Sequence, residues 1–536
     1  MDWDNYRKNL QLKLRRIRNE PAITNEEQLN KAAKILTKAL QETTKEVVKL
    51  SRPKLDTKRW WNNDLKKTKK ELNRLRSKSY SYRTLTHHPS HRELKTKNRE
   101  YREAIIQAKR THWTNYLEEM TANEMWTANK YIKELAGNGG NPGIPTLKAK
   151  DTAGNNISVN NNKGKAKLFA KAFFPPPPPT ENDYTDYNYP EPLMDPPQIS
   201  AEILQKHIDK LSPYKAHGPD DIPNVVIKQC AAIIQAQLLQ IFRVIIKLGI
   251  YHDPWREFTT VVLRKPNKPC YKTPKAYRPI ALLSCIAKVL TSIIAESISN
   301  LVETHQLLPK THFGGHPGHT TMDAIHYLIE KIKTAWRGDQ VVSILFLDVE
   351  GAFPNTVTNQ LLHNLKKRRI PAKLVKFILQ LLTNRKTRIK FDDYISDIID
   401  ILNGIGQGDP LSMILYIIYN ANILEIPDDE NKEVALGYVD NIAMIAIGKD
   451  FDKSTNHLEN MMKKEGGGLQ WSEEHNSQFK ATKSAILHLT RRTILDPDAE
   501  DRRIPLERLP LILKGKTVRE VECHKYLGIQ IDSQLR

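Results

Sequence analysis

Two aspartates and an asparagine lie at the ends of apolar runs. In these positions the two aspartate carboxylates could bind metal ions. Asp348 closes the apolar run 341–348, while Asp440 and Asn441 lie between two further apolar runs. A carboxylate at the end of a buried strand is held rigidly at the edge of the core. If Asp348 and Asp440 lie on neighbouring strands, they can hold two Mg²⁺ ions about 3.5–4 Å apart. Such a pair stabilises both the attacking and the departing oxygen of a phosphoryl transfer.

The runs on either side of Asp440 and Asn441, residues 434–439 and 442–447, are separated by only these two residues. A two-residue Asp-Asn link tolerates the positive φ of a tight turn, so the pattern predicts a β-hairpin with its polar pair at the tip. Sequence spacing alone does not place Asp440 beside Asp348. A plain hairpin turn, and an aspartate that only caps a helix, therefore remain alternatives.

The rest of the chain predicts the elements that would position these residues. From about residue 200 onward, helix-like and strand-like apolar segments alternate, which is typical of an α+β domain. Residues 22–50 and 62–135 carry apolar residues at helical spacing among many charges, which predicts long amphipathic helices with basic outer faces. Residues 137–165 are rich in Gly, Asn and Pro and predict a loop or a weak hairpin. Pro175–Pro179 predicts a stiff spacer, with an SH3-type ligand as the alternative.

The charge of the chain favours a polyanionic partner. Lys and Arg number 83 against 61 Asp and Glu, a net charge of +22, and residues 1–135 hold 32 basic and 17 acidic residues. A field of this sign favours nucleic acid, and a solvated basic region without a ligand is the alternative. The 4 cysteines form no close pair, and the N-terminus is too polar for a signal peptide. No run approaches the ~18 apolar residues of a spanning helix. We therefore expect an intracellular protein, nuclear or cytoplasmic, that is neither secreted nor transmembrane.

Several short motifs occur in a fixed order. They are AHGPDDIPN (216–224), LRKP (263–266), YRPIALL (277–283), FGGHPGHTT (313–321), FLDVEGAF (346–353), NGIGQGDPLS (403–412), GYVDN (437–441), HNSQFKATKS (475–484) and HKYLGIQID (524–532). From about residue 200 to the end, this series resembles the reverse transcriptases of non-LTR, LINE-like retrotransposons. The basic segment with Trp60 and Trp61 is similar to what precedes the polymerase in such elements, and FFPPPPP (173–179) suggests the fungal branch.

The resemblance implies an α+β right-hand polymerase, with fingers and a palm built on an antiparallel sheet, preceded by a basic helical region. The implied boundaries are a basic helical region at 1–135, a loop and proline-rich linker at 136–200, fingers at 201–340, a palm at 341–490 and a primer-grip hairpin at 491–536, with the reverse transcriptase core at 246–515. The implied activity is RNA-directed DNA synthesis. Its partners would be an RNA template, a DNA primer and dNTPs, without a membrane, and its cofactors two Mg²⁺ or Mn²⁺ ions.

The resemblance also assigns roles to single residues. The implied metal ligands are Asp348, Asp440 and Val349, the catalytic set adds Asn441 and Lys483, the substrate-binding residues are Lys265, Arg278, Phe353, Gln407 and Gly408, and the primer grip is Tyr526, Leu527 and Gly528. Phe353 would be a steric gate that excludes a ribose 2′-OH, and Lys483 would act as a general acid near the leaving pyrophosphate. An ordinary core phenylalanine and an exposed lysine are the alternatives. Lys265 and Arg278 would hold the triphosphate through fixed positive charge.

The sequence also departs from the family's usual pattern. Asn441 stands where a second Asp is usual, His316 and His319 where Arg is usual, and Asp221 where Gly is usual. Asn keeps a carbonyl oxygen for a metal ion but removes one negative charge, so we expect a weakened enzyme. Each change is reachable by one G-to-A mutation, which suggests a decaying genomic copy. Intact sibling copies that also carry Asn441 would contradict that hypothesis.

Further readings of the same residues stay open. His312, His316 and His319 have a spacing that suggests zinc, but the glycines and the proline among them argue against it. The resemblance stops near Arg536, so we expect no thumb, and we also expect neither an endonuclease nor an RNase H beside the polymerase motifs. The rival function is a non-catalytic, nucleic-acid-binding remnant of a polymerase. A viral RNA polymerase is a third reading, which Phe353 disfavours.

Overall fold

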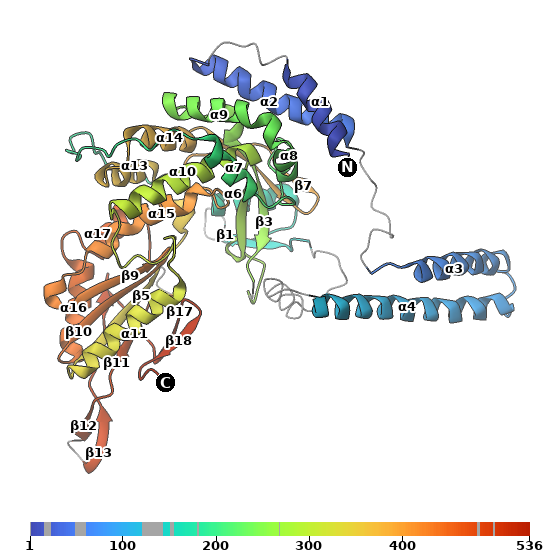
Figure 1. Ribbon diagram of the computed structural model, residues 1–536. Coiled ribbons are helices and arrows are strands. Elements are labelled where there is room, and N and C mark those ends of the chain that lie inside the picture. The colour runs from blue at the N-terminus through green and yellow to red at the C-terminus, as the bar shows by residue number, and fades with distance from the viewer. Residues whose placement is uncertain are drawn as a thin grey trace. The chain divides into compact units, whose positions relative to one another are not determined.

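The computed structural model of the 536-residue chain divides into two compact units (Figure 1). The first unit comprises Met1–Val47 and Ile144–Arg536, and the second comprises Val48–Gly143. Within them the structure describes residues 2–15, 23–48, 60–119, 143–150, 155–179, 182–266, 268–479, 483–496 and 499–536.

A five-stranded sheet, here called the palm sheet, carries the carboxylates. Its strands, in spatial order, are β16 (Arg519–Glu520), β11 (Ala485–Leu489), β5 (Val341–Asp348), β10 (Asn441–Gly448) and β9 (Glu433–Tyr438). The β5 strand runs antiparallel to both β10 and β11, and β10 runs antiparallel to β9. Only the two-residue β16 pairs in parallel. The structure thus has the antiparallel palm sheet that the sequence predicted.

The side chains of β5 alternate between two cores, as the period of a strand requires. Leu345 and Leu347 face the larger core, where the buried face of α16 (Phe451–Lys463) packs. Ile344 and Phe346 face a smaller core, which also holds buried residues of α11 (Thr321–Arg337). The two helices therefore cover opposite faces of the palm sheet (Figure 1). This sandwich buries almost the whole strand and leaves Asp348, at its end, partly exposed.

A second sheet, here called the fingers sheet, carries the predicted cationic residues. Its strands are β3 (Glu257–Arg264), β4 (Tyr277–Leu282), β6 (Arg385–Phe391), β7 (Tyr394–Ile395) and β8 (Ile399–Ile401). The β3 strand pairs antiparallel with β4 and parallel with β6. Residues 385–401 thus belong with the fingers, whereas the sequence assigned them to the palm. Conversely α11, predicted in the fingers, packs on the palm sheet.

The segment predicted as a linker, 136–200, is partly folded onto the fingers sheet. Strands β1 (Leu147–Lys150) and β2 (Asn156–Val159) form the weak hairpin that was one of the two predictions for this stretch. Helix α6 (Asn162–Phe173) was not predicted. Phe169 and Phe173, one helical turn apart, are buried in one cluster with residues of β3, β4 and β6. That apolar pair explains why the segment folds instead of remaining a spacer.

The larger core is built mainly from helices. They include α7 (Ala201–Asp209), α8 (Asn224–Gln229), α9 (Ala231–Leu248), α10 (Cys285–Thr304), α13 (Thr358–Lys367), α14 (Ala372–Leu382), α15 (Leu411–Asn420) and α17 (Gly468–Glu474). Contrary to the sequence expectation, α9 and α10 are long and apolar enough to cross a membrane, by length and composition alone. Both helices contribute buried side chains to this core, including Leu238 and Leu290. A core helix passes the same test, and this is the role that both helices have here.

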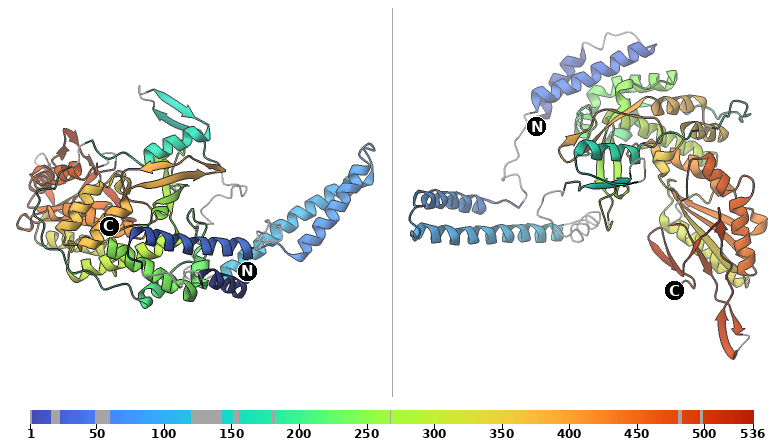
Figure 2. Two further views of the ribbon diagram at one scale, coloured as in Figure 1. Left: turned by 90° about the horizontal axis from the view of Figure 1, so that it is seen from above. Right: turned by 180° about the vertical axis from the view of Figure 1, so that it is seen from behind.

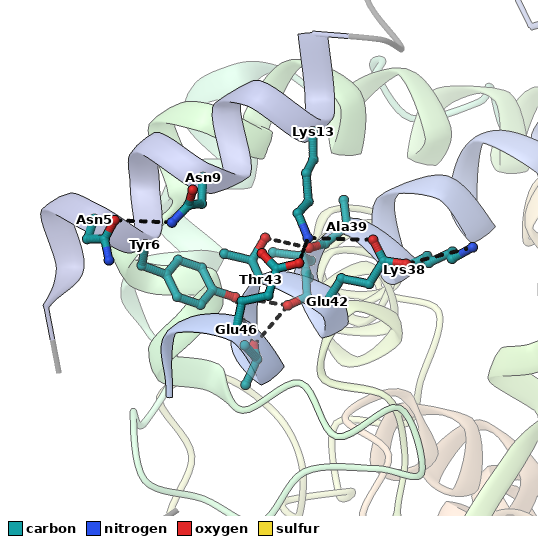
Figure 3. Close-up of polar contacts among 11 residues, drawn as sticks. Asn5, Tyr6, Asn9, Lys13, Lys38, Ala39, Glu42, Thr43 and Glu46 are labelled. Carbon is teal, nitrogen blue, oxygen red and sulfur yellow. Dashed lines mark hydrogen bonds and ion pairs between the residues drawn. The ribbon is translucent and has the colours of Figure 1, made fainter. Parts of the chain in front are cut away.

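The first two helices form a hairpin that joins the larger core. Helices α1 (Trp3–Arg15) and α2 (Glu26–Val47) lie beside α9 (Figures 1 and 2). Figure 3 shows polar contacts of this hairpin, among them the ion pair of Lys13 with Glu46 at 2.6 Å. The Tyr6 hydroxyl also donates to the Leu40 carbonyl at 3.1 Å. Residues 1–47 therefore group with residues 144–536, although the sequence placed the boundary near residue 135.

The described part of the second unit is a helical hairpin. Helices α3 (Asn63–Ser81) and α4 (Pro89–Glu119) are joined by the ion pairs Lys97–Glu71 at 2.9 Å and Lys78–Glu93 at 3.7 Å. Within residues 60–119, 15 Lys and Arg stand against 7 Asp and Glu. The predicted basic helices are confirmed here, and the predicted continuation over 120–135 lies outside the described residues.

Candidate functional site

The tip of the β9–β10 hairpin places the second aspartate. Tyr438 pairs with Asn441, so the two-residue turn consists of Val439 and Asp440. The predicted hairpin is confirmed, but its tip lies one residue earlier than predicted. Val439, not Asp440 or Asn441, takes a positive φ, of 57°. A positive φ at the first turn position matches a type II′ turn. In a β-branched residue it costs roughly 1–3 kcal/mol and persists only where the surroundings impose it.

The sheet register brings the predicted carboxylates together. Asp348 and Asn441 are direct partners across the antiparallel β5–β10 pair, so their side chains share one face of the sheet. Asp440 directly precedes Asn441, whose amide donates to its carboxylate at 3.2 Å. Burial raises the pKa of Asp440 above its usual value, and the nearby charge of Asp348 raises that pKa further. The two aspartates therefore feel each other's charge, as two groups that share one cation would.

Lys483 neutralises part of this charge. Its ammonium group donates to both carboxylate oxygens of Asp348, at 2.7 and 2.9 Å. The lysine side chain is 52% exposed, so solvent screens the pair. Lys483 and Arg278 both lower the pKa of Asp440, in opposition to its burial. The predicted cations thus act on both predicted carboxylates.

The donor set fits a hard divalent cation. Two carboxylates and one amide oxygen are the ligand types that Mg²⁺ prefers, and Mg²⁺ commonly needs only one or two protein carboxylates when substrate phosphates supply the rest. Among the described residues, no cluster of three or more His, Cys, Asp or Glu could hold a metal ion without such help. Val349, predicted as a ligand, has a buried side chain and forms a backbone bridge with Phe479.

Phe353 lies on the short helix α12 (Ala352–Asn355), just after Asp348 in the chain. Its ring stacks on that of Tyr416 with centroids 4.9 Å apart, and it is only partly buried. The Phe353 carbonyl accepts from the Ile405 amide at 2.8 Å, which ties this helix to the loop that carries Gln407. The ring is therefore held by Tyr416 and is only partly buried.

The loop with Gln407 and Gly408 lies against the fingers sheet. The Gln407 carbonyl accepts from the Ala281 amide of β4 at 2.7 Å. Gly408 has a φ of 123°, and a Cβ there would lie 2.7 Å from the Ala281 carbonyl oxygen, so glycine is required. The Asp409 carboxylate accepts from the Leu411 amide at 3.0 Å, at the start of α15, where Pro410 takes the N-cap position.

The two predicted triphosphate-binding cations lie on the β3–β4 hairpin. Arg278 is exposed on β4, and Lys265 follows β3, with its ammonium donating to the Lys275 carbonyl at 2.9 Å. Lys275, which the sequence did not single out, forms an ion pair of 2.5 Å with Glu350. Glu350 stands two residues after Asp348, so this pair links the fingers hairpin to the carboxylate edge of the palm.

The predicted primer grip is a hairpin of β17 (Cys523–Tyr526) and β18 (Ile529–Asp532). Its turn residues Leu527 and Gly528 have φ values of 47° and 93°, and positive φ at both positions fits a type I′ turn. Tyr526 is buried, and the ring of His524 stacks on Phe346 with centroids 4.1 Å apart. Because Phe346 and Asp348 share a face of β5, this hairpin packs on the face that carries the carboxylates.

The departures also have structural correlates. Asp221 has a φ of 54°, a conformation that glycine adopts at no steric cost. His316 pairs with Glu303 at 2.6 Å. Sequence analysis missed the contact of Asn420, at the end of α15, with the carbonyl of Val439. An Asn at the end of an almost wholly apolar helix was the available signal.

Comparisons with known proteins show which family the chain matches. Residues 263–531 match the family described as reverse transcriptase (RNA-dependent DNA polymerase). The chain is 25% identical over 343 residues to a probable RNA-directed DNA polymerase from transposon BS of Drosophila melanogaster, covering 63% of this chain and 36% of the relative. It is 25% identical over 346 residues to the RNA-directed DNA polymerase from mobile element jockey of the same species, covering 63% and 35%. The chain thus spans about a third of the length of these relatives.

Solved structures are also similar to part of this chain, and one of them is a telomerase. Apo telomerase from Candida tropicalis, truncated from its C-terminal domain, aligns with a TM-score of 0.35 and 10% identity, over 57% of this chain and 66% of that chain. A similarity at this level carries no argument about the site.

Proposed function

We propose a function from the premise that this chain belongs to the reverse transcriptase (RNA-dependent DNA polymerase) family, whose match covers residues 263–531. The chain is proposed to be the polymerase of a retrotransposon. It would join a dNTP to the 3′-OH of a DNA primer along an RNA template. We further propose that it acts inside the cell, and its fungal origin stays a prediction.

One observation supports this function most directly: Asp348 and Asp440 meet at one edge of the palm sheet beside a lysine and an arginine. Asp348 is the cross-strand partner of Asn441, which directly follows Asp440 in the chain. The charge of Asp348 raises the pKa of Asp440. Lys483 contacts Asp348, and Arg278 lies close enough to lower the pKa of Asp440. Two carboxylates beside two cationic side chains suit a substrate that carries phosphates and binds together with divalent ions.

Asp348 and Asp440 would hold two Mg²⁺ or Mn²⁺ ions, with Asn441 contributing a neutral oxygen. When bound, such ions supply charge neutralisation for the attacking and departing oxygens of phosphoryl transfer. Lys483 donates to both oxygens of Asp348, so a cation bound to that carboxylate would compete with the ammonium group for it. A lysine displaced in this way is free to approach the leaving pyrophosphate.

The remaining residues would select and orient the nucleotide. Arg278 and Lys265 on the fingers hairpin would hold the triphosphate. Phe353, fixed by Tyr416, would lie where a ribose 2′-OH falls, and Gln407 would contact the nucleotide from a loop pinned to β4. The hairpin with Tyr526 would hold the primer on the carboxylate face.

Primer extension on an RNA template tests this proposal. The natural protein, Asn441→Asp and Asp348→Ala would be compared with dNTPs and either Mg²⁺ or Mn²⁺. Extension by the natural protein or by Asn441→Asp, abolished by Asp348→Ala, would support the polymerase. Equal extension with Asp348→Ala would reveal a contaminating enzyme and contradict the proposal.

A second function has its own supporting observation. Asn441 removes one negative charge from the site, and Lys483 offsets the charge of Asp348. A site that has lost this much charge fits a polymerase remnant that binds nucleic acid without catalysis. Failure of all three proteins to extend a primer, with RNA binding retained, would favour the remnant over the enzyme.

A further inference from the structure

Three groups form a hydrogen-bonded chain behind the tip of the β9–β10 hairpin. The side-chain amide nitrogen of Asn420 donates to the carbonyl of Val439. The amide oxygen of Asn420 lies 3.2 Å from Nε2 of His312. Asn420 is 1% exposed and His312 is 2% exposed, so neither group can exchange these bonds for water. The chain ends on the residue that directly precedes Asp440.

The partners determine which group donates at each step. A backbone carbonyl can only accept, so the nitrogen of the Asn420 amide must face Val439. The amide oxygen then faces His312, and Nε2 of the ring must carry a hydrogen. Burial lowers the pKa of His312 to about 4, which keeps the ring neutral near pH 7. A neutral ring with hydrogen on Nε2 is therefore the form that completes the chain.

The segment that carries His312 is anchored to the same hairpin. The Phe313 amide donates to the Gly437 carbonyl at 2.8 Å, and the Gly437 amide donates to the Thr311 carbonyl at 3.0 Å. A Cβ at Gly314 would lie 2.6 Å from the backbone nitrogen of Val439. The histidine, the strand and the turn thus keep a fixed spacing, which a relay of hydrogen bonds requires.

The bond from Asn420 acts at the point where the backbone is strained. Val439 has a φ of 57°, and its carbonyl belongs to the peptide unit that continues into Asp440. The orientation of that unit sets the direction in which the Asp440 side chain leaves the turn. Without a donor on this carbonyl, the turn can relax toward conformations that β-branched residues prefer.

We propose that His312 and Asn420 are positioning residues, which hold the Val439–Asp440 peptide so that the Asp440 carboxylate faces Asp348. The consequence for kinetics rests on the proposed polymerase function, whereas the consequence for the turn does not. The competing account is that two buried polar groups merely satisfy each other. In that account the turn does not depend on the N–H of residue 312.

Matched substitutions separate the two accounts. His312→Gln keeps an N–H donor at a similar reach from the backbone, and His312→Leu removes it. Asn420→Asp replaces the donor to Val439 with a carboxylate oxygen that repels the carbonyl. His305→Leu, at an exposed histidine that ends α10, is the control for a His-to-Leu change.

Hydrogen exchange of the full chain tests the effect on the turn. Exchange at residues 437–443 should rise about tenfold in His312→Leu and Asn420→Asp, because the local opening of the turn becomes easier. In His312→Gln and His305→Leu it should stay within about twofold of the natural protein. Equal exchange in His312→Gln and His312→Leu would overturn the relay, and so would an unchanged turn in Asn420→Asp.

Single-nucleotide addition in an Asn441→Asp background tests the effect on catalysis. His312→Leu and Asn420→Asp should lower kcat about 10–100-fold, the usual loss when a partner that orients a ligand is removed. KM for the dNTP should change by less than about twofold, and His312→Gln should recover most of kcat. Altered exchange with unaltered kcat would overturn the positioning role. Absence of addition in the background itself would contradict the polymerase function, while the exchange result would still decide the relay.

Discussion

The pKa of Asp440 is set by opposing effects of its surroundings. Asp440 lies at a strained turn, where burial and Asp348 raise its pKa, while Lys483 and Arg278 lower it. Its neighbour Asn441 lacks the charge that would have raised that pKa further. Asn in place of Asp at position 441 therefore reduces the repulsion between negative charges in the metal-free site. It also weakens the attraction of the site for cations.

The raised pKa of Asp440 predicts a pH-dependent stability in metal-free protein. Ionising a carboxyl whose folded pKa is raised costs stability, and that cost is present above the folded pKa and absent below the unfolded value of 3.8. We expect Asp440→Asn to raise the free energy of unfolding at pH 7. The difference should shrink as the pH falls through the raised pKa toward 3.8. Urea unfolding at several pH values measures it. Asp393→Asn, at an exposed turn, is the control, and an equal gain there would contradict the account.

Phe353 predicts a change in sugar selectivity. Its ring stacks on Tyr416, so a smaller side chain removes the proposed gate and leaves the platform behind it. In an Asn441→Asp background, we expect Phe353→Val to lower the preference for dNTP over rNTP, as the ratio of kcat/KM values, by about 10²-fold. Phe353→Tyr keeps the ring and should keep the preference. Unchanged selectivity in Phe353→Val would mean that Phe353 is an ordinary core residue.

At the scale of elements, the site depends on the close approach of the loop with Gly314 to the turn with Val439. A Cβ at Gly314 would lie 2.6 Å from the Val439 nitrogen, which no side-chain motion can relieve. We expect Gly314→Ala to lower the free energy of unfolding by about 1–3 kcal/mol, the usual cost of overpacking. Gly338→Ala is the matched control, because its Cβ would lie 3.5 Å from the nearest atom. Equal urea midpoints for the two variants would show that the approach is not tight.

Local patterns predicted the elements that carry the carboxylates. The apolar run that ends in Asp348 became β5, and the paired runs around Asp440 became a hairpin. The tip of that hairpin was predicted one residue late, because Asp and Asn are the usual residues at positive φ. In the structure the positive φ belongs to Val439. The carbonyl of Val439 accepts from Asn420, which lies 19 residues earlier in the sequence and on another element.

Pairing between distant strands could not be predicted from local patterns. The parallel pairing of β3 with β6 joins segments more than a hundred residues apart, so strands assigned to the palm became part of the fingers sheet. Helix α6 was missed because the Gly- and Asn-rich residues before it suggested a loop. Its buried Phe169 becomes informative only once the fingers sheet is present. The contacts of Lys483 and Lys275 are likewise fixed by tertiary structure.

At the scale of the whole molecule, the basic helical hairpin forms a unit of its own. We propose that it holds RNA mainly through phosphates, so its affinity should fall steeply with salt. Changing the exposed Lys67, Lys70 and Arg74 of α3 to Gln should reduce the slope of log Kd against log salt by about 2, near 0.7 per lost contact with a single strand. Binding to single-stranded RNA across a salt series measures this.

The control for that experiment removes the same charge from the first unit. Lys34, Lys38 and Lys45 are exposed on α2, and their change to Gln should leave the slope nearly unchanged. An equal effect of both triple variants would indicate that net charge, and not the α3–α4 hairpin, governs binding.

We propose that Asp348, Asp440 and residue 441 together form a metal-dependent polymerase site. The most direct test is the Mg²⁺ dependence of single-nucleotide addition on an RNA template, with the natural protein, Asn441→Asp, and Asn441→Asp combined with Asp348→Ala. We predict that Asn441→Asp lowers the Mg²⁺ concentration at half-maximal rate by about 10–100-fold, and that adding Asp348→Ala abolishes addition. Equal Mg²⁺ dependence with residue 441 as Asn or Asp, or addition that survives the loss of Asp348, would contradict this account.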